Sequence, residues 1–331
     1  MSDRYKVLSD WLKQLGYQNY SLSPASADAS FRSYLRLQME DQSWIVMDAP
    51  PDREPCDRFI AIAKKLRDAN LSAPEVIEQN LQQGFLILTD FGASDYLSLL
   101  NPASEGPLYA DALAAIQQMQ TRIGADDLPA YDENLLNQEM DLFHDWFLEK
   151  LMGIELDRCQ RSSWQLIKQT LVENALEQPQ LFVHRDFHSR NLMKIEQGNP
   201  GILDFQDAIK GPVTYDLVSL LRDCYIDWPP IRVDRLLHDY YEFARGNGLV
   251  DVTAVKFRRW FNLMGIQRHL KAIGIFSRLK IRDGKSAYLK DIPRTLAYVS
   301  QVSAGEMSTA GLFSMVEKLG LSVRVDNLGM D

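Results

Sequence analysis

Three oxygen-bearing side chains follow two apolar runs in the middle of the chain, and their spacing is typical of phosphoryl transfer. The stretch "LFVHRDFHSRNLM" at 181–193 carries Asp186 and, five residues later, Asn191. A second apolar run, "GILDFQD" at 201–207, carries Asp204. Phosphoryl transfer needs a carboxylate near the attacking hydroxyl and oxygen ligands for the Mg²⁺ that accompanies a nucleotide. We therefore predict Asp186 as the catalytic base and Asn191 and Asp204 as metal ligands.

Each of these residues has an ordinary explanation when it is taken alone. Asp186 could form a turn, Asn191 could cap a helix and Asp204 could end a strand. The combination of H-R-D-x-x-x-x-N, an apolar run before each carboxylate and D-F close behind is far more specific. We expect His184 to brace the loop. Asp216 is expected either to bond back to the backbone of this loop or to cap the following helix.

The elements that must position these residues follow two patterns. The first part of the chain contains short alternating or apolar runs typical of strands, such as "LRLQMED", "WIVMDAPP" and "GFLILTDFG", and a helix with one buried stripe over 57–69. The later part contains long helical patterns, interrupted by short strands near 181–184 and 201–205. These patterns predict an α+β protein with a small strand-rich lobe, 1–92, and a large, mostly helical lobe, 93–331.

The composition is that of a globular protein and argues against several classes. Hydrophobic residues make up 46% and charged residues 24% of the chain, so a packed core is expected. The three scattered cysteines do not form a disulfide framework. A net charge of −9 argues against a nucleic-acid binder, and neither a signal-peptide core nor a membrane-spanning run is present. We expect a cytoplasmic protein without nucleic-acid or membrane partners, and the oligomeric state stays open.

Positive charge is concentrated in one segment near the C-terminus. Residues 252–294 contain eleven Lys or Arg and two Asp, although the whole chain is acidic. Such a segment fits a binding site for an anion, and a solvated helix face without a partner is the alternative. We expect the acceptor to be bound by residues of this segment and of the 181–193 stretch: Arg190, Arg268, His269 and Lys271.

The second lobe resembles the aminoglycoside-phosphotransferase and choline-kinase branch of the protein-kinase-like fold. More narrowly, several stretches resemble the bacterial anomeric sugar kinases that phosphorylate N-acetylmuramate and N-acetylglucosamine: "DASFRSY" (28–34), "VMDAPP" (46–51), "HRDFHSRN" (184–191), "DFQDAIKGPVTYDLVSLLRD" (204–223) and "GIQRHLKAIGIFSRLKIRDGK" (265–285). The resemblance implies a two-lobed kinase whose first lobe binds ATP and whose second lobe binds the acceptor. It implies ATP- and Mg²⁺-dependent formation of the sugar 1-phosphate in peptidoglycan recycling.

The first lobe departs from the general kinase pattern at three places. The loop "SPASADASF" at 23–31 has no glycine, the expected strand lysine falls near Met47, and the helix over 57–69 has no Glu. We expect Arg32 to replace the lysine, because its planar guanidinium binds phosphate well. Arg36 is a weaker candidate, and the alternative for Arg32 is a solvent-facing strand residue without a role in binding. The expected nucleotide-binding residues are thus Ser30, Phe31 and Arg32.

Two other functions stay open at this point. An aminoglycoside or another amino alcohol could be the acceptor, although a pocket for such polycations should be rich in Asp and Glu. A nucleotide-binding pseudokinase would explain the missing Lys, Glu and glycines. Against it, a protein without catalysis would be free to lose Asp186, Asn191 and Asp204, and all three are present.

Overall fold

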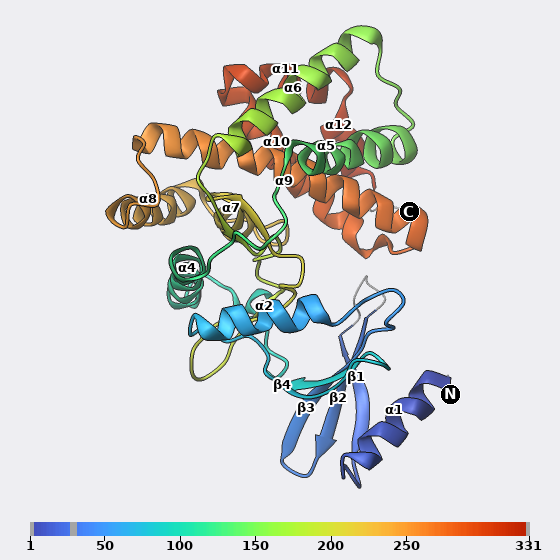
Figure 1. The fold of residues 1–331 in the computed structure, drawn as a ribbon. Helices are drawn as coiled ribbons and strands as arrows, with labels where there is room; N and C mark the ends of the chain where they lie inside the picture. The colour runs from blue at the N-terminus through green and yellow to red at the C-terminus, as the bar shows by residue number, and fades with distance from the viewer. Residues whose placement is uncertain (1–2, 27–31, 329–331) are drawn as a thin grey trace. The chain divides into compact units, whose positions relative to one another are not determined.

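The computed structural model describes residues 3–26 and 32–328, and the chain forms two compact units. Unit 1 contains the residues up to 111 together with 190–206, and unit 2 contains the rest. Figure 1 labels the elements of both units. The boundary between functional lobes after residue 92 stays a prediction.

Unit 1 is built on a five-stranded antiparallel sheet in the order β1-β2-β3-β5-β4. The predicted strands "LRLQMED" and "WIVMDAPP" are present as β2 and β3, which form a hairpin and pair Leu35 with Val46 and Leu37 with Trp44. The first four residues of β5 are buried, so this strand lies in the interior of the unit. The strands are β1 (Ser21–Ser26), β2 (Ser33–Met39), β3 (Gln42–Asp48), β4 (Val76–Asn80) and β5 (Phe85–Thr89).

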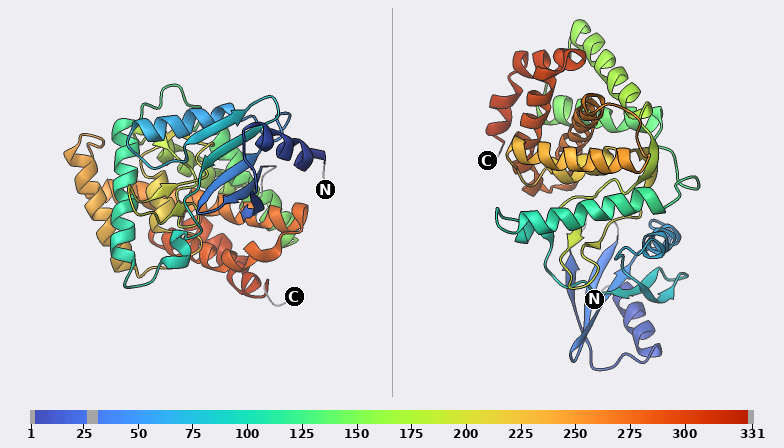
Figure 2. Two further views of the ribbon diagram at one scale, coloured as in Figure 1. Left: turned by 90° about the horizontal axis from the view of Figure 1, so that it is seen from below. Right: turned by 90° about the vertical axis from the view of Figure 1, so that its left-hand side faces the viewer.

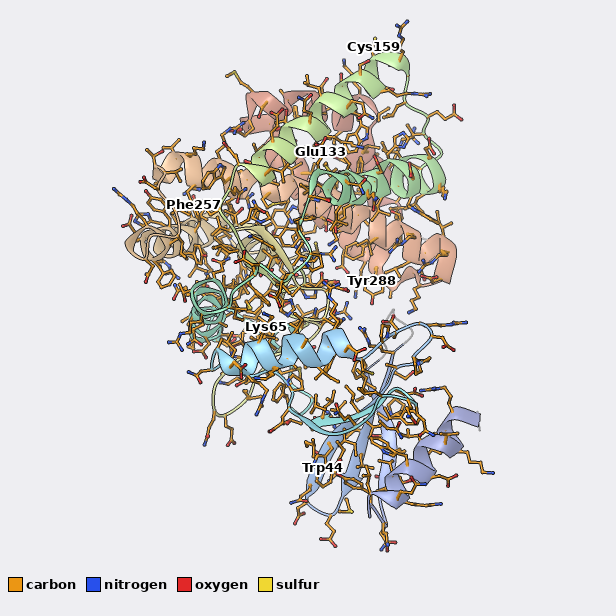
Figure 3. All side chains as sticks on the ribbon, in the orientation of Figure 1. Trp44, Lys65, Glu133, Cys159, Phe257 and Tyr288 are labelled. Atoms are coloured by element: carbon orange, nitrogen blue, oxygen red, sulfur yellow. The ribbon has the colours of Figure 1, made fainter. Side chains whose placement is uncertain are left out.

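Helix α1 (Asp3–Gln14) covers part of this sheet with its apolar stripe. Trp11 stacks on Phe85 with 5.7 Å between ring centroids. Trp44, labelled in Figure 3, contacts Tyr17 edge-on beside this core. The buried residues of the cluster are Leu8, Trp11, Leu12, Leu37, Val46, Phe85 and Ile87.

The helix predicted over 57–69 is present as α2 (Asp57–Asp68), and its buried stripe is the one expected from the spacing. The stripe consists of Phe59, Ile62, Ala63 and Leu66. Unit 1 also contains α3 (Tyr96–Leu99), the start of α4 (Glu105–Arg122) and the short ladder of β7 (Leu192–Met193) with β8 (Gly201–Ile202). The predicted strand over 201–205 is therefore shorter than expected. It stops before Asp204, whose φ of 60° is left-handed and cannot continue a strand.

Unit 2 is mostly helical and contains one two-stranded sheet. Its helices are α5 (Glu133–Leu142), η1 (Phe143–Leu151), α6 (Arg158–Leu176), α7 (Tyr215–Leu221), α8 (Pro230–Gly246), α9 (Ala254–Asp283), η2 (Ser286–Asp291), α10 (Ile292–Gly305), η3 (Met307–Thr309), α11 (Ala310–Lys318) and α12 (Leu321–Asp326), and its strands are β6 (Gln180–Val183) and β9 (Ile209–Pro212). No helix of the described chain is long and apolar enough to span a membrane.

Helix α9 is the central element of unit 2. It packs against α5, η1, α6, α7 and α10 (Figure 2). The helix begins after Thr253, whose hydroxyl accepts from the Lys256 amide, and ends at Gly284 with a left-handed φ of 69°. Gly274 allows the close approach of the end of α5, because a Cβ there would lie 2.4 Å from the backbone of Leu142. The basic segment of the sequence is therefore largely a core helix.

Candidate active site

The Asp186 loop follows strand β6 in unit 2, and its first residues are held by a buried carboxylate of α7. Asp216 accepts hydrogen bonds from the backbone N–H groups of His184 (2.7 Å) and Arg185 (3.0 Å). The helix cap position belongs to Thr214. The prediction that Asp216 bonds back to the loop is confirmed, and the alternative of a plain helix cap is wrong. The bonds fix the loop at Arg185, whose φ of 78° is unfavourable for a side chain with a Cβ.

Burial dominates the protonation of Asp216. Desolvation raises the pKa of its carboxyl to about 7, although the two backbone N–H donors act in the opposite direction and the charge of Asp186 adds to the rise. The ionised carboxylate accepts hydrogen bonds at both oxygens, whereas the protonated form carries a hydrogen on one of them. The two hydrogen bonds from the loop backbone to Asp216 are therefore strongest above neutral pH.

A second buried carboxylate, Asp223, holds the other end of the same loop. It accepts from the backbone N–H of Ser189 (2.9 Å), from the Ser189 hydroxyl (2.5 Å) and from the Tyr225 N–H (3.0 Å). The loop from His184 to Ser189 is thus fixed at both ends. Neither Asp223 nor Ser189 was predicted. The available signal in the sequence was the spacing of Asp216 and Asp223, which are seven residues, or about two helical turns, apart.

His184 braces the loop from inside, as expected. The ring is fully buried and lies edge-on to Phe187 with 5.6 Å between centroids. Its Nδ1 lies 3.3 Å from the Asp186 backbone nitrogen and accepts from it. These contacts fix the conformation of the loop, so His184 has a structural role.

The Asp186 carboxylate lies in a positive field. Loss of solvent by itself would raise its pKa, but the charges of Lys271, His188, Arg185 and Arg268 outweigh this effect and hold the pKa below its ordinary value. The carboxylate is therefore ionised at neutral pH. This is the state required of a group that accepts a proton from an acceptor hydroxyl.

Glu139 of α5 gathers two of these cations and was not predicted. Its buried carboxylate pairs with Arg185 and with the Lys271 ammonium at 3.1 Å, and it accepts from the Tyr131 hydroxyl. Burial would raise the pKa of Glu139, but Lys271 and Arg185 outweigh it and lower the pKa. Lys271 also donates to the Tyr215 hydroxyl at 3.1 Å. Lys271, expected to bind the acceptor, is thus held within the protein.

The other expected acceptor residues lie in different surroundings. His269 is buried, its Nε2 lies 2.9 Å from the Arg222 carbonyl, and its ring stacks on Tyr298. Burial lowers the pKa of His269 to about 3, so the ring is neutral. These are contacts of a packing residue. Arg268 is buried in unit 2, whereas Arg190 belongs to unit 1 and is exposed.

The two predicted metal ligands are brought together within unit 1. The β7–β8 ladder is continued by a bond from the Leu203 N–H to the Asn191 carbonyl at 2.9 Å. The Asn191 amide nitrogen lies 3.3 Å from one Asp204 oxygen, and the Gln206 amide donates to the other at 2.7 Å. Asp204 adopts a left-handed φ of 60°, as Arg185 does, and such conformations are retained where the surrounding structure enforces them. A carboxylate and an amide oxygen are ligands that suit Mg²⁺.

Arg32, the expected phosphate ligand, is a buried cation of unit 1. Its Nη2 lies 2.9 Å from Oε2 of Glu54, a partner that the sequence did not indicate. Met47 is fully buried, so the strand position of the expected lysine faces the core. Arg36 is engaged elsewhere, with the Asp90 carboxylate at 2.6 Å. The other two expected nucleotide-binding residues, Ser30 and Phe31, lie outside the described residues.

The comparison with known proteins identifies the family. The model of the phosphotransferase enzyme family matches residues 21–249. An N-acetylmuramate/N-acetylglucosamine kinase of Pseudomonas aeruginosa is 44% identical, with 90% of this chain and 88% of the relative covered. The protein of that name from Neisseria meningitidis is 40% identical, with 94% and 95% covered. The chain belongs to the N-acetylmuramate/N-acetylglucosamine kinase family.

Solved structures show the same fold for this family member. Choline kinase LicA from Streptococcus pneumoniae aligns with a TM-score of 0.63 at 12% identity, covering 91% of this chain and all of the other. The ADP-bound aminoglycoside phosphotransferase APH(2″)-Ib aligns with a TM-score of 0.58 at 16% identity, covering 90% and 98%. The predicted α+β, protein-kinase-like fold and the predicted phosphotransferase class are confirmed. The pseudokinase alternative is not supported, since the relatives are named kinases.

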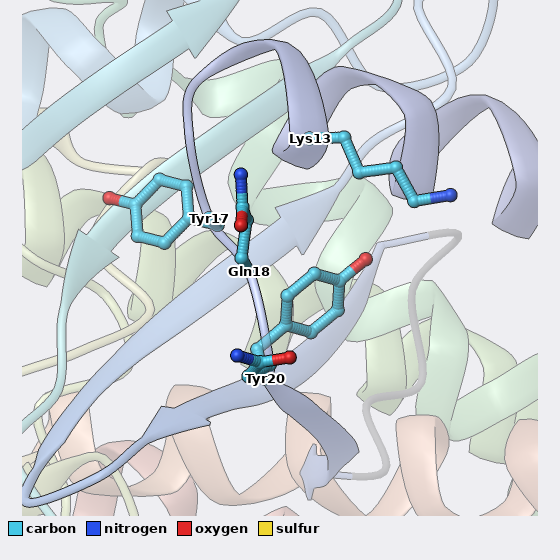
Figure 4. Close-up of a pocket in the computed structure, with 5 residues that line it drawn as sticks. Lys13, Tyr17, Gln18 and Tyr20 are labelled. Carbon is cyan, nitrogen blue, oxygen red and sulfur yellow. The ribbon is translucent and has the colours of Figure 1, made fainter.

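A surface hollow in unit 1 lies among residues with no part in this chemistry. It has a volume of about 400 Å³ and lies at the end of α1 (Figure 4). Its lining residues are Lys13, Tyr17, Gln18, Asn19 and Tyr20. None of them is a predicted site residue of this kinase family member.

Proposed function

We propose that this kinase phosphorylates the anomeric hydroxyl of N-acetylmuramate, of N-acetylglucosamine or of both, with ATP as the donor. The observation that carries the proposal is the 40–44% identity to three kinases named for these sugars, over at least 90% of this chain. The product would be the sugar 1-phosphate, formed in the recycling of peptidoglycan. Because ATP is the donor, we place the reaction in the cytoplasm.

In the proposed reaction Asp186 orients the anomeric hydroxyl and accepts its proton. The hydroxyl oxygen forms a bond to the γ-phosphorus of ATP, the bond from that phosphorus to the β–γ bridging oxygen breaks, and ADP leaves. The lowered pKa of Asp186 keeps its carboxylate free of a proton at neutral pH. The carboxylates of Asp216 and Asp223 hold the loop that carries it.

Nucleotide use is supported by solved relatives of the fold that contain ADP or ATP. We propose that Asn191 and Asp204 hold Mg²⁺, since their side chains offer oxygen donors and lie together in unit 1. A bound Mg²⁺ neutralises phosphate charge during transfer. Ser30, Phe31 and Arg32 are the proposed contacts to the nucleotide phosphates, and residues 1–92 and 93–331 are the proposed nucleotide and acceptor lobes.

A panel of acceptors tests the proposal, with ADP release measured in a coupled assay. We expect turnover with N-acetylmuramate or N-acetylglucosamine and little with aminoglycosides. Some structural neighbours are aminoglycoside phosphotransferases bound to gentamicin or streptomycin, but at 14–17% identity they share only the fold. Strong turnover on kanamycin-type acceptors and none on N-acetylhexosamines would reverse the assignment.

A further inference from the structure

Among the cations of the described chain that are at most 9% exposed, all but one have a carboxylate partner. Four are at most 9% exposed: Arg32, Lys168, Arg268 and Lys271. Three of them form ion pairs, Arg32 with Glu54, Lys168 with Asp141 and Lys271 with Glu139. Among the described residues, Arg268 has no carboxylate within ion-pair distance.

The single polar contact of the Arg268 side chain with a described residue is weak. Its Nη1 lies 3.7 Å from the sulfur of Cys224, and its Nε has no hydrogen-bond partner in the same part of the chain. A guanidinium has five N–H donors, and burying donors that have no hydrogen-bond partner is unfavourable. Such a group is satisfied best by a planar carboxylate, which accepts two parallel hydrogen bonds. The Nε donor of Arg268 is thus open to a carboxylate ligand.

The surroundings of Arg268 connect it to the catalytic loop within unit 2. Cys224, its contact, directly follows the loop-holding Asp223. The next residue, Tyr225, lies edge-on to His188 of the loop at 5.3 Å. The charge of Arg268 also contributes to the lowered pKa of Asp186. The open donors therefore belong to the neighbourhood of the proposed base.

An aromatic row begins at the same place. Tyr225 is followed by Phe276 at 6.3 Å, and Phe276 stacks on Tyr288 at 5.6 Å with an interplanar angle of 14°. Tyr288, labelled in Figure 3, belongs to η2 and is partly exposed. Aromatic faces provide apolar contact area for the C–H face of a sugar ring. A charged donor and an apolar platform thus lie close together on unit 2.

We infer that Arg268 binds a carboxylate of the acceptor, while the partly exposed Tyr225 and Tyr288, which the buried Phe276 links, receive the sugar ring. The inference rests on the proposed function. N-acetylmuramate carries a lactyl carboxylate that N-acetylglucosamine lacks, so Arg268 discriminates between the two sugars. His269 and Lys271 have protein partners already, so the carboxylate is bound by Arg268 and not by them.

The two sugars form a matched pair for the test. The value of kcat/KM is measured for each with the wild type, with Arg268→Met and with Arg268→Lys. Arg258→Met is the control, since Arg258 lies on the same helix and pairs with Asp234 on the surface. We expect Arg268→Met to lower kcat/KM for N-acetylmuramate by roughly tenfold to a hundredfold, the loss of a charged hydrogen bond. For N-acetylglucosamine the change should stay within about threefold, and Arg268→Lys should recover part of the loss.

Two outcomes would overturn the inference. If Arg268→Met lowers kcat/KM equally for both sugars, Arg268 acts through Asp186 or the fold. If kcat/KM falls for neither sugar, Arg268 has no role in selecting the acceptor. Calorimetric binding of N-acetylmuramate provides a readout without turnover. If the wild type phosphorylates neither sugar, the proposed function fails. In that case the carboxylate site still predicts that the wild type binds N-acetylmuramate more tightly than Arg268→Met does. Equal affinity of the two proteins, or no binding by either, would exclude the site.

Discussion

Arg32 and Glu54 form an ion pair in unit 1, with 2.9 Å between Nη2 and Oε2. Arg32 lies directly before β2 and Glu54 three residues before α2, so the pair links the sheet to the segment that enters the helix. Protein kinases make a comparable link with a lysine on the third strand and a glutamate on the following helix. Here the strand position is the buried Met47. We propose that the Arg32–Glu54 pair replaces that link.

The first prediction concerns both members of this pair. Arg32→Ala should lower kcat by roughly a hundredfold to a thousandfold, the effect of losing one preorganised donor to the phosphates. Glu54→Gln should lower it less, because Arg32 stays present but is less firmly oriented. Steady-state kinetics with circular dichroism as a folding check measures both. Glu78→Gln, on the exposed face of β4, is the control. Unchanged activity of Arg32→Ala would mean that another group binds the phosphates.

The second prediction concerns the clamp on the Asp186 loop. Asp223→Asn replaces one acceptor oxygen by an NH₂ group. The two Ser189 bonds end at Oδ2 and the Tyr225 N–H bond ends at Oδ1, so the variant cannot keep all three. We expect kcat to fall by about tenfold or more while the KM for ATP changes little. Ser189→Ala removes only the hydroxyl bond and should cost about 1 kcal/mol of stability with a smaller effect on kcat. A normal kcat for Asp223→Asn would contradict the positioning role.

The third prediction is a pH dependence of stability that arises from His269. Burial lowers its pKa to about 3 from the ordinary 6.5. Between these values the unfolded chain binds a proton that the folded protein does not, so the free energy of unfolding falls as the pH falls below about 6.5. The slope of this contribution is about 1.4 kcal/mol per pH unit. Urea denaturation at pH 5 and pH 7 measures it.

The variant His269→Gln isolates this contribution. Glutamine keeps a donor for the Arg222 carbonyl but does not titrate, so the drop in stability between pH 7 and pH 5 should be about 2 kcal/mol smaller than in the wild type. Equal drops in the two proteins would show that His269 is not a buried neutral ring. A selective loss of acceptor binding at constant stability would instead return His269 to the acceptor site.

Motif spacing and periodicity predicted the parts of this protein that depend on neighbours along the chain. The stripe of α2 follows from the helical repeat, and the role of Asp216 follows from its place at the start of a buried helix after the motif. The partners of the buried cations could not be predicted in this way. Glu139 contacts Lys271 from a distant part of the chain, and Glu54 precedes its helix instead of lying on it. Charge alone does not show which cation is neutralised inside the protein.

The fourth prediction separates chemistry from binding at Asp186. Asp186→Asn keeps the size of the side chain but cannot accept the proton, so turnover should be abolished. Nucleotide binding, measured by calorimetry, should be largely retained, since the proposed nucleotide contacts belong to other residues. Loss of ATP binding in a folded Asp186→Asn protein would assign this residue to the nucleotide site.

Identification of the phosphorylated product tests the central claim most directly. The protein is incubated with ATP and Mg²⁺ and with each N-acetylated sugar, and the product is analysed by phosphorus NMR with proton coupling. We expect a phosphate coupled to the anomeric proton, which defines the sugar 1-phosphate, and no such product with Asp186→Asn. A phosphate on any other hydroxyl, or a near-normal yield from Asp186→Asn, would contradict it.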